Sequence, residues 1–123
     1  MSDETATVLL SHGSGGKLTH DLIVDHMRHK FSRDYKEVKV NAQGNPDLIL
    51  GNHGLVLANV EVETDGSINT EKALEWKAMA GQGVKLILMV PKNSKVKVTE
   101  LLWENSIMDR VSVGSYEIAI NMP

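Results

Sequence analysis

Hydrophobic and polar positions follow two different periods along the chain. Between residues 17 and about 31, apolar residues recur at helical spacing, which predicts a first helix. The following segment changes to alternation, with turn residues between the runs, and predicts an antiparallel meander of strands at about 38–42, 47–50 and 55–63. The helical period then returns, with Asn69 or Thr70 as its N-terminal cap and Gly81 as its C-terminal cap.

The C-terminal part begins with a continuous apolar run at 86–90. Such a run is typical of a strand that is covered on both faces and reached by a helical crossover. A third helix is expected around 98–103, and a last strand at 111–113, with 116–120 as a candidate extension. The pattern predicts an α/β fold: one domain, 1–123, with a three-layer αβββαβ(α)β core and a mixed central sheet. Residues 1–16 are expected as an N-terminal tail and glycine-rich loop, although 7–10 is apolar enough for a strand.

Composition removes several classes of function. The 123 residues include no cysteine, which excludes disulfides, thiolate metal sites and cysteine nucleophiles. A net charge of −3 argues against a protein that coats DNA non-specifically, but it does not exclude an enzyme that approaches a polyanion through metal ions. No apolar run approaches the ~20 residues of a membrane span. We therefore expect a cytoplasmic protein without a membrane partner.

Three carboxylates are expected to meet on one face of the meander. Alternation along 55–63 puts Glu61 and Glu63 on the same side of their strand, and counting back from the hairpin turn places Asp47 opposite residues 58–59, within reach of Glu61. Such carboxylates repel one another unless a cation, a proton or a basic side chain compensates them. Mg²⁺ is the usual cation for oxygen ligands. The competing interpretation is that Asp47 is an ordinary strand-start or turn residue and the glutamates form the solvated face of an edge strand.

Pro46-Asp47, thirteen intervening residues and then Glu61-Val62-Glu63 resemble the PD-(D/E)XK motif of the restriction-endonuclease-like superfamily. The expected element order over about 17–90 also resembles that superfamily's αβββαβ core. The resemblance implies a restriction-endonuclease-like fold, Mg²⁺ held by Asp47 and Glu61, and hydrolysis of phosphodiesters in nucleic acid.

The motif departs from the family at its third position, where Glu63 replaces the lysine that helps to activate the attacking water. Some members of the family place this lysine on the following helix, so Lys72, or Lys77 on the helical side of Ala73, can serve, with Glu63 as a ligand or general base. The missing lysine equally fits a domain that kept the fold without the chemistry. Such a domain would be a binding or assembly module, as a homodimer or with a protein partner.

The glycine-rich segment His12–Lys17 is a second candidate site. Backbone N–H groups at a helix N-terminus bind anions, so Ser14, Gly15, Gly16 and Lys17 are candidates for a phosphate- or nucleotide-binding loop. Residues 9–23 resemble the N-terminal segment of the HypE family of hydrogenase-maturation proteins, which use ATP. Because HypE chemistry needs a C-terminal cysteine, only the anion-binding loop carries over. The competing interpretation is a loop that allows a tight start of the helix. Most of the five histidines are expected in structural or solvent-exposed roles.

Overall fold

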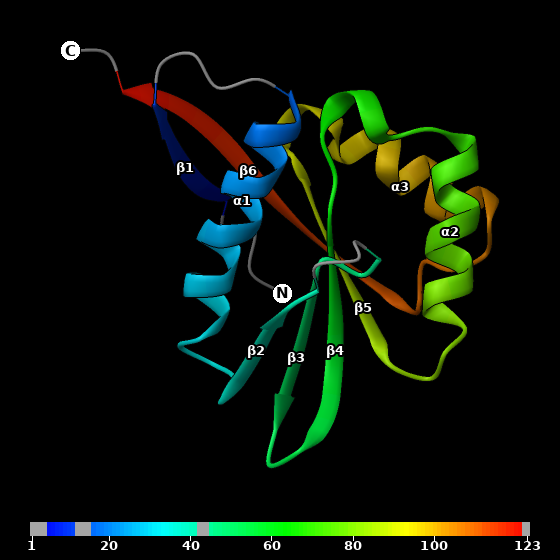
Figure 1. Ribbon diagram of the computed structural model, residues 1–123. Coiled ribbons are helices and arrows are strands. Elements are labelled where there is room, and N and C mark those ends of the chain that lie inside the picture. Colours follow the sequence, from blue (N-terminus) through cyan, green and yellow to red (C-terminus); the bar gives the residue numbers. More distant parts are fainter. Residues whose placement is uncertain (1–4, 12–15, 42–44, 122–123) are drawn as a thin grey trace.

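The computed structural model describes residues 5–11, 16–41 and 45–121 (Figure 1). Within these ranges the chain forms six strands, three α-helices and two single-turn 3₁₀ helices. In chain order they are β1 (Thr5–Ser11), α1 (Gly16–Phe31), β2 (Glu37–Val40), β3 (Leu48–Asn52), β4 (Leu55–Val62), η1 (Asp65–Ser67), α2 (Thr70–Ala80), β5 (Lys85–Pro91), η2 (Lys92–Ser94), α3 (Lys95–Glu104) and β6 (Val111–Asn121).

All six strands belong to one mixed sheet, in the order β1-β6-β5-β4-β3-β2. Strands β2, β3 and β4 form the antiparallel meander, whereas β4, β5, β6 and β1 run parallel to one another. The expected α/β class and mixed sheet are therefore confirmed. The assignment of 1–16 to a tail and loop alone was wrong, because residues 5–11 pair with β6 along its C-terminal half and form an edge of the sheet.

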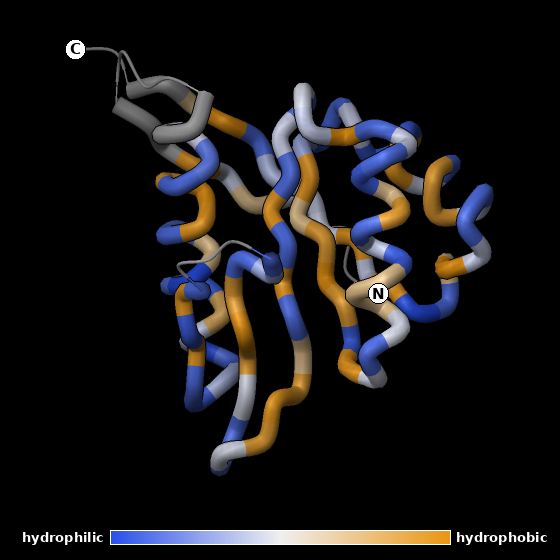
Figure 2. The backbone as a smooth tube through the Cα atoms, turned by 45° about the vertical axis from the view of Figure 1, so that its right-hand side comes forward, coloured by the Kyte–Doolittle hydropathy of each residue, from blue (hydrophilic) through white to orange (hydrophobic). Residues whose placement is uncertain are grey.

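The sheet separates two apolar cores, so the molecule has three layers. Helix α1 covers one face, where Ile23 and Met27 pack with residues of β3 and β4. Helices α2 and α3 cover the other face, with Trp76 and Leu102 in the second core. Figure 2 shows the hydrophobic positions gathered along the strands between these helical layers. Successive residues of β5 enter opposite cores, which explains its continuous apolar run and confirms that prediction.

Local sequence accounts for the ends of α2 and for the β3–β4 hairpin. The Asn69 side chain accepts a hydrogen bond from the backbone N–H of Lys72 at 2.8 Å and caps the helix. The hairpin turn uses His53 and Gly54, whose φ angles of 53° and 81° are the positive values that a two-residue turn requires. Next to the turn, a Cβ on Gly51 would lie 2.4 Å from the carbonyl oxygen of Leu55, so only glycine fits there.

A register shift in this hairpin moves the acidic residues closer than simple counting predicts. The pairing slips between Leu50 and Gly51, and Leu48 therefore faces Val60. Asp47, directly before Leu48, consequently lies beside Glu61 rather than opposite residues 58–59. The turn lies at His53 and Gly54, one residue further along the chain than a turn centred on Asn52 and His53, and the bulge adds one more residue to β4. Together they move the partner of Asp47 from residue 58 to Glu61.

Across the described parts of the chain, no helix combines the length and apolar character that crossing a bilayer requires.

Candidate functional site

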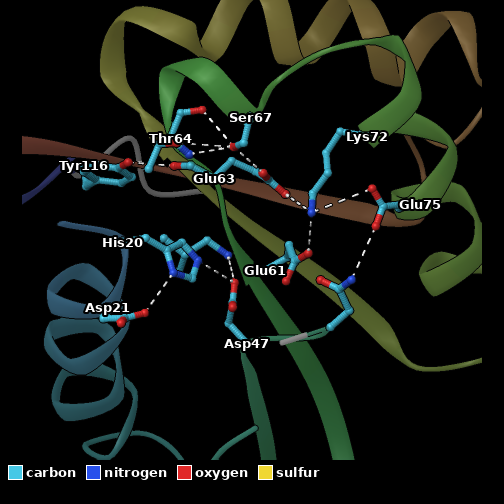
Figure 3. Close-up of polar contacts among 12 residues, drawn as sticks. His20, Asp21, Asp47, Glu61, Glu63, Thr64, Ser67, Lys72, Glu75 and Tyr116 are labelled. Carbon is cyan, nitrogen blue, oxygen red and sulfur yellow. Dashed lines mark hydrogen bonds and ion pairs between the residues drawn. The ribbon is translucent and has the colours of Figure 1, made fainter. Parts of the chain in front are cut away.

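Asp47, Glu61 and Glu63 gather where the end of β4 meets the start of β3 (Figure 3). Helix α1 and the first turn of α2 contribute the neighbouring side chains. The three acidic residues are 6%, 1% and 1% exposed. The alternative of a solvated edge strand was therefore wrong, because β4 lies between β5 and β3 inside the sheet.

Asp47 is fixed by the backbone of the neighbouring strand. Its Oδ2 atom accepts a hydrogen bond of 2.7 Å from the backbone N–H of Val62. The same oxygen lies 3.3 Å from Nε2 of His20, on α1. Asp47 is thus both a strand-start residue and one member of an interaction that joins α1 to the meander.

Both carboxylate oxygens of Glu63 accept hydrogen bonds from neighbouring side chains. Its Oε1 accepts a hydrogen bond from Ser67 Oγ at 2.7 Å, and its Oε2 accepts one from Trp76 Nε1 at 2.9 Å. The Tyr116 hydroxyl also donates to the Glu63 carbonyl oxygen at 2.6 Å. Both the side chain and the backbone of Glu63 are therefore anchored by neighbouring groups.

Of the two candidate lysines, the fold brings only Lys72 to the acidic cluster. Its Nζ lies 3.2 Å from Glu61 Oε2 and 3.8 Å from Glu63 Oε2, and a third carboxylate oxygen, on Glu75, is 3.9 Å away. Lys77 is exposed although Ala73 is buried. The buried arc of α2 runs through Trp76 toward Lys72, and Lys77 projects beyond its other border. The placement of Lys77 beside the cluster was wrong for that reason.

Burial and mutual repulsion control the charges in this cluster. Burial, followed by the neighbouring Asp47, raises the pKa of Glu61 to about 8. Burial also raises the pKa of Glu63, against the lowering effect of its hydrogen bonds from Ser67 and Trp76. For Lys72, burial opposes protonation, but the Glu63 and Glu61 carboxylates outweigh it and the pKa is raised.

His20 supplies a second internal positive charge. Its hydrogen bond to Asp47 outweighs the effect of burial and raises its pKa to about 9. The histidine is therefore protonated at neutral pH and faces Asp47, while Lys72 faces the two glutamates. The cluster is thus compensated from both helical layers.

The donor set fits a metal ion that takes few protein ligands. In the ranges that the structure describes, no three histidine or carboxylate side chains converge on a single metal position. Asp47 and Glu61, which are adjacent across the sheet, nevertheless offer two carboxylates. Mg²⁺ commonly takes one or two carboxylates and completes its shell with water and substrate phosphate. Asp47 and Glu61 satisfy that requirement, while both Glu63 oxygens already accept hydrogen bonds.

The candidate phosphate loop falls mostly outside the described residues. Ser14 and Gly15 lie in the undescribed stretch 12–15, and Gly16 and Lys17 are the first residues of α1. The loop therefore remains a prediction from the sequence.

Sequence reasoning missed the residues that support the carboxylates. His20 shares the face of α1 that carries Ile23 and Met27, and its position on this buried face was the available signal. Ser67 is only four residues from Glu63, in the turn that follows β4, and its hydroxyl was not recognised as a partner. Nothing in the local sequence connects Tyr116 with Glu63, because Tyr116 is 53 residues away and belongs to another strand. Trp76 is fully buried in the core, and its N–H group donates to Glu63.

Comparison with known proteins adds no relative: no family model, no curated protein and no solved structure matches the chain.

Proposed function

We propose that this protein is a restriction-endonuclease-like phosphodiesterase that hydrolyses nucleic acid with the help of a divalent metal ion. The proposal combines the motif at Asp47, Glu61 and Glu63 with the αβββαβ order over α1–β5. A net charge of −3 is compatible with it, because a metal ion rather than a basic surface would meet the reacting phosphate.

The observation that carries the proposal is the position of Lys72. The motif lacks its lysine, yet a lysine from the next helix lies 3.2 Å from Glu61 and 3.8 Å from Glu63. Turning a lysine inward partly removes its ammonium group from water, which is costly, although the two carboxylates offset part of that cost. A catalytic role gives the inward lysine a function beyond this charge compensation.

Each residue then has a distinct task. Asp47 and Glu61 hold Mg²⁺, which supplies a bound water of lowered pKa and neutralises charge on the phosphate. Lys72 orients the attacking water through its ammonium group and offsets phosphate charge. Glu63, expected from sequence as a ligand or base, instead positions Lys72, since its carboxylate is fixed by Ser67 and Trp76.

A second function is favoured by the same charges. Lys72 and protonated His20 already compensate the buried carboxylates, so the cluster is stable as an internal ion network without a metal. In that case the protein is a catalytically silent module of the same architecture, acting by assembly with a partner or a second copy. The two functions can be distinguished by metal binding, which the nuclease requires and the silent module does not.

The first experiment is a titration of Mn²⁺ into isotope-labelled protein, with paramagnetic broadening of backbone amides as the readout. If the protein is a metal-dependent nuclease, the broadening should centre on Asp47, Glu61 and Glu63 in the wild type. It should be lost in Asp47→Asn. Asp109→Asn, a carboxylate on a distant turn, is the matched control and should broaden as the wild type does. If millimolar Mn²⁺ gives diffuse broadening that both variants share, the nuclease proposal fails and the silent module replaces it.

A further inference from the structure

A basic cleft lies between α1 and the edge strand β1, away from the acidic cluster. It encloses about 240 Å³ and is lined by Ala6, Thr7, His26, His29, Lys30 and Arg33. Every lining residue from α1 or just after it is a histidine, a lysine or an arginine, and none is acidic. Figure 1 shows α1 and β1 side by side along this border of the molecule.

The spacing of these residues explains why they act together. Positions 26, 29, 30 and 33 follow the i, i+3, i+4, i+7 pattern, so they form one stripe along the helix surface. Asp25 borders this stripe: it pairs with Arg28 at 2.8 Å, and its other carboxylate oxygen lies 3.8 Å from Nε2 of His29. Within the described residues, neither Lys30 nor Arg33 forms an ion pair. Lys30 and Arg33 therefore supply the cleft with positive charge that no described acidic side chain compensates.

We propose that this cleft binds the phosphodiester backbone of a nucleic acid at a distance from the reacting phosphate. The choice of ligand rests on the proposed function, and the cleft supplies what the acidic cluster lacks, namely positive charge for several phosphates. In a chain of net charge −3, such charge must be local to be effective.

The position of the stripe on α1 sets the reach of this contact. At about 1.5 Å per residue, Lys30 lies about 15 Å along the helix axis from His20, whose ring is 3.3 Å from Asp47, and Arg33 follows just beyond the end of α1. One strand of a duplex has a phosphate about every 3.4 Å along the axis. On a duplex whose axis follows α1, Lys30 meets a phosphate about four base pairs from the site, a contact that fixes the register of the substrate without reading its sequence.

The test compares two double variants that lose the same charge. Lys30→Gln with Arg33→Gln removes the cations of the cleft, and Lys85→Gln with Lys97→Gln removes two exposed lysines of β5 and α3. Binding to a fluorescent duplex of about 20 base pairs is measured by anisotropy in EDTA, between about 50 and 200 mM salt. The cleft variant should bind at least about tenfold more weakly at low salt, and its salt slope should be shallower by about 2.

The control variant should retain the affinity and slope of the wild type. Equal losses in the two double variants would overturn the proposal, as would failure of the wild type to bind the duplex. A lower melting temperature of the cleft variant with unchanged duplex binding would also overturn the proposal. It would mean that the cations stabilise the C-terminal end of α1 through the helix dipole and do not bind nucleic acid. If the double variant is unfolded, the single variants Lys30→Gln and Arg33→Gln decide, each with an expected change in slope of about 1.

The Mn²⁺ titration keeps this proposal separable from the proposed function. Duplex binding that depends on the cleft, without site-specific Mn²⁺ broadening, would leave a nucleic-acid-binding protein that is not a nuclease. Mn²⁺ broadening at Asp47, together with duplex binding that is unchanged when Lys30 and Arg33 are replaced, would support the metal site and refute the proposed role of the cleft.

Discussion

The two sides of β4 are equally buried and chemically opposite. On the α1 side, Val60 and Val62 are at most 2% exposed and pack in a wholly apolar core. On the α2 side, Glu61 and Glu63 are each 1% exposed. Burying valine stabilises the fold, whereas burying a carboxylate destabilises it unless neighbouring groups compensate the charge. One strand thus carries a stabilising face and a face whose residues are hard to explain by stability.

The two faces of β4 place different demands on the sequence. The apolar face needs only shape and volume, and other aliphatic residues could replace its side chains with modest loss. The acidic face needs particular partners: Lys72 from α2, His20 from α1 and the backbone of Val62. Such specific compensation is expected where ionisable groups serve a reaction.

The largest expected effect concerns Lys72. Lys72→Met should lower nucleic-acid cleavage by about 10²–10⁴-fold, the range for loss of a positioned group that assists proton transfer. Lys77→Met, on the same helix and exposed, should leave cleavage within about twofold, since surface changes of this kind are nearly neutral. Initial rates on labelled DNA and RNA in Mg²⁺ measure both. Equal rates for Lys72→Met and the wild type would remove Lys72 from the chemistry.

On the apolar face, Val60→Ala should destabilise the protein by about 2 kcal/mol, because it removes buried methyl groups and leaves a small cavity. The measurement is urea unfolding followed by circular dichroism. Site-specific Mn²⁺ broadening should persist in this variant. Its disappearance in the folded protein would show that the two faces of β4 are not independent.

On the acidic face, a substitution should increase the stability of the protein rather than lower it. Glu61 has a pKa raised to about 8 in the folded protein, above its ordinary value near 4.5. Its protonated form is therefore favoured by folding, and this stability is present below about pH 4.5 and lost as pH rises through about 8. Glu61→Gln should stabilise the metal-free protein by up to about 4 kcal/mol at pH 8, because each pKa unit corresponds to about 1.4 kcal/mol, and should change its stability by less than about 1 kcal/mol near pH 5. Destabilisation at pH 8 would mean that the Glu61–Lys72 ion pair outweighs the burial of the carboxylate.

The smallest effect belongs to His20, whose side chain is 31% exposed. Because its folded pKa of about 9 lies above the ordinary 6.5, its contribution is complete below about pH 6.5 and disappears as pH rises through 9. The stability difference between wild type and His20→Gln in EDTA should be below about 1 kcal/mol at pH 6 and smaller at pH 9.5. A difference that grows with pH would contradict the ion pair with Asp47.

The sequence by itself determined the elements of this protein. Periodicity gave the order of helices and strands from α1 onward, Asn69 marked the start of α2, and the run at 86–90 indicated a strand buried on both faces. It also placed Glu61 and Glu63 on one side of one strand. These properties depend on residues close together in the chain, whose relative directions are set by the helix or strand itself.

Only the tertiary structure decided which residues meet. The turn and the bulge of the β3–β4 hairpin put Asp47 beside Glu61, and the packing of α2 selected Lys72 over Lys77. The fold also brought His20 to Asp47 and the Tyr116 hydroxyl to Glu63. The distance between side chains on different elements depends on how whole helices and strands pack, and no local period in the sequence contains that information.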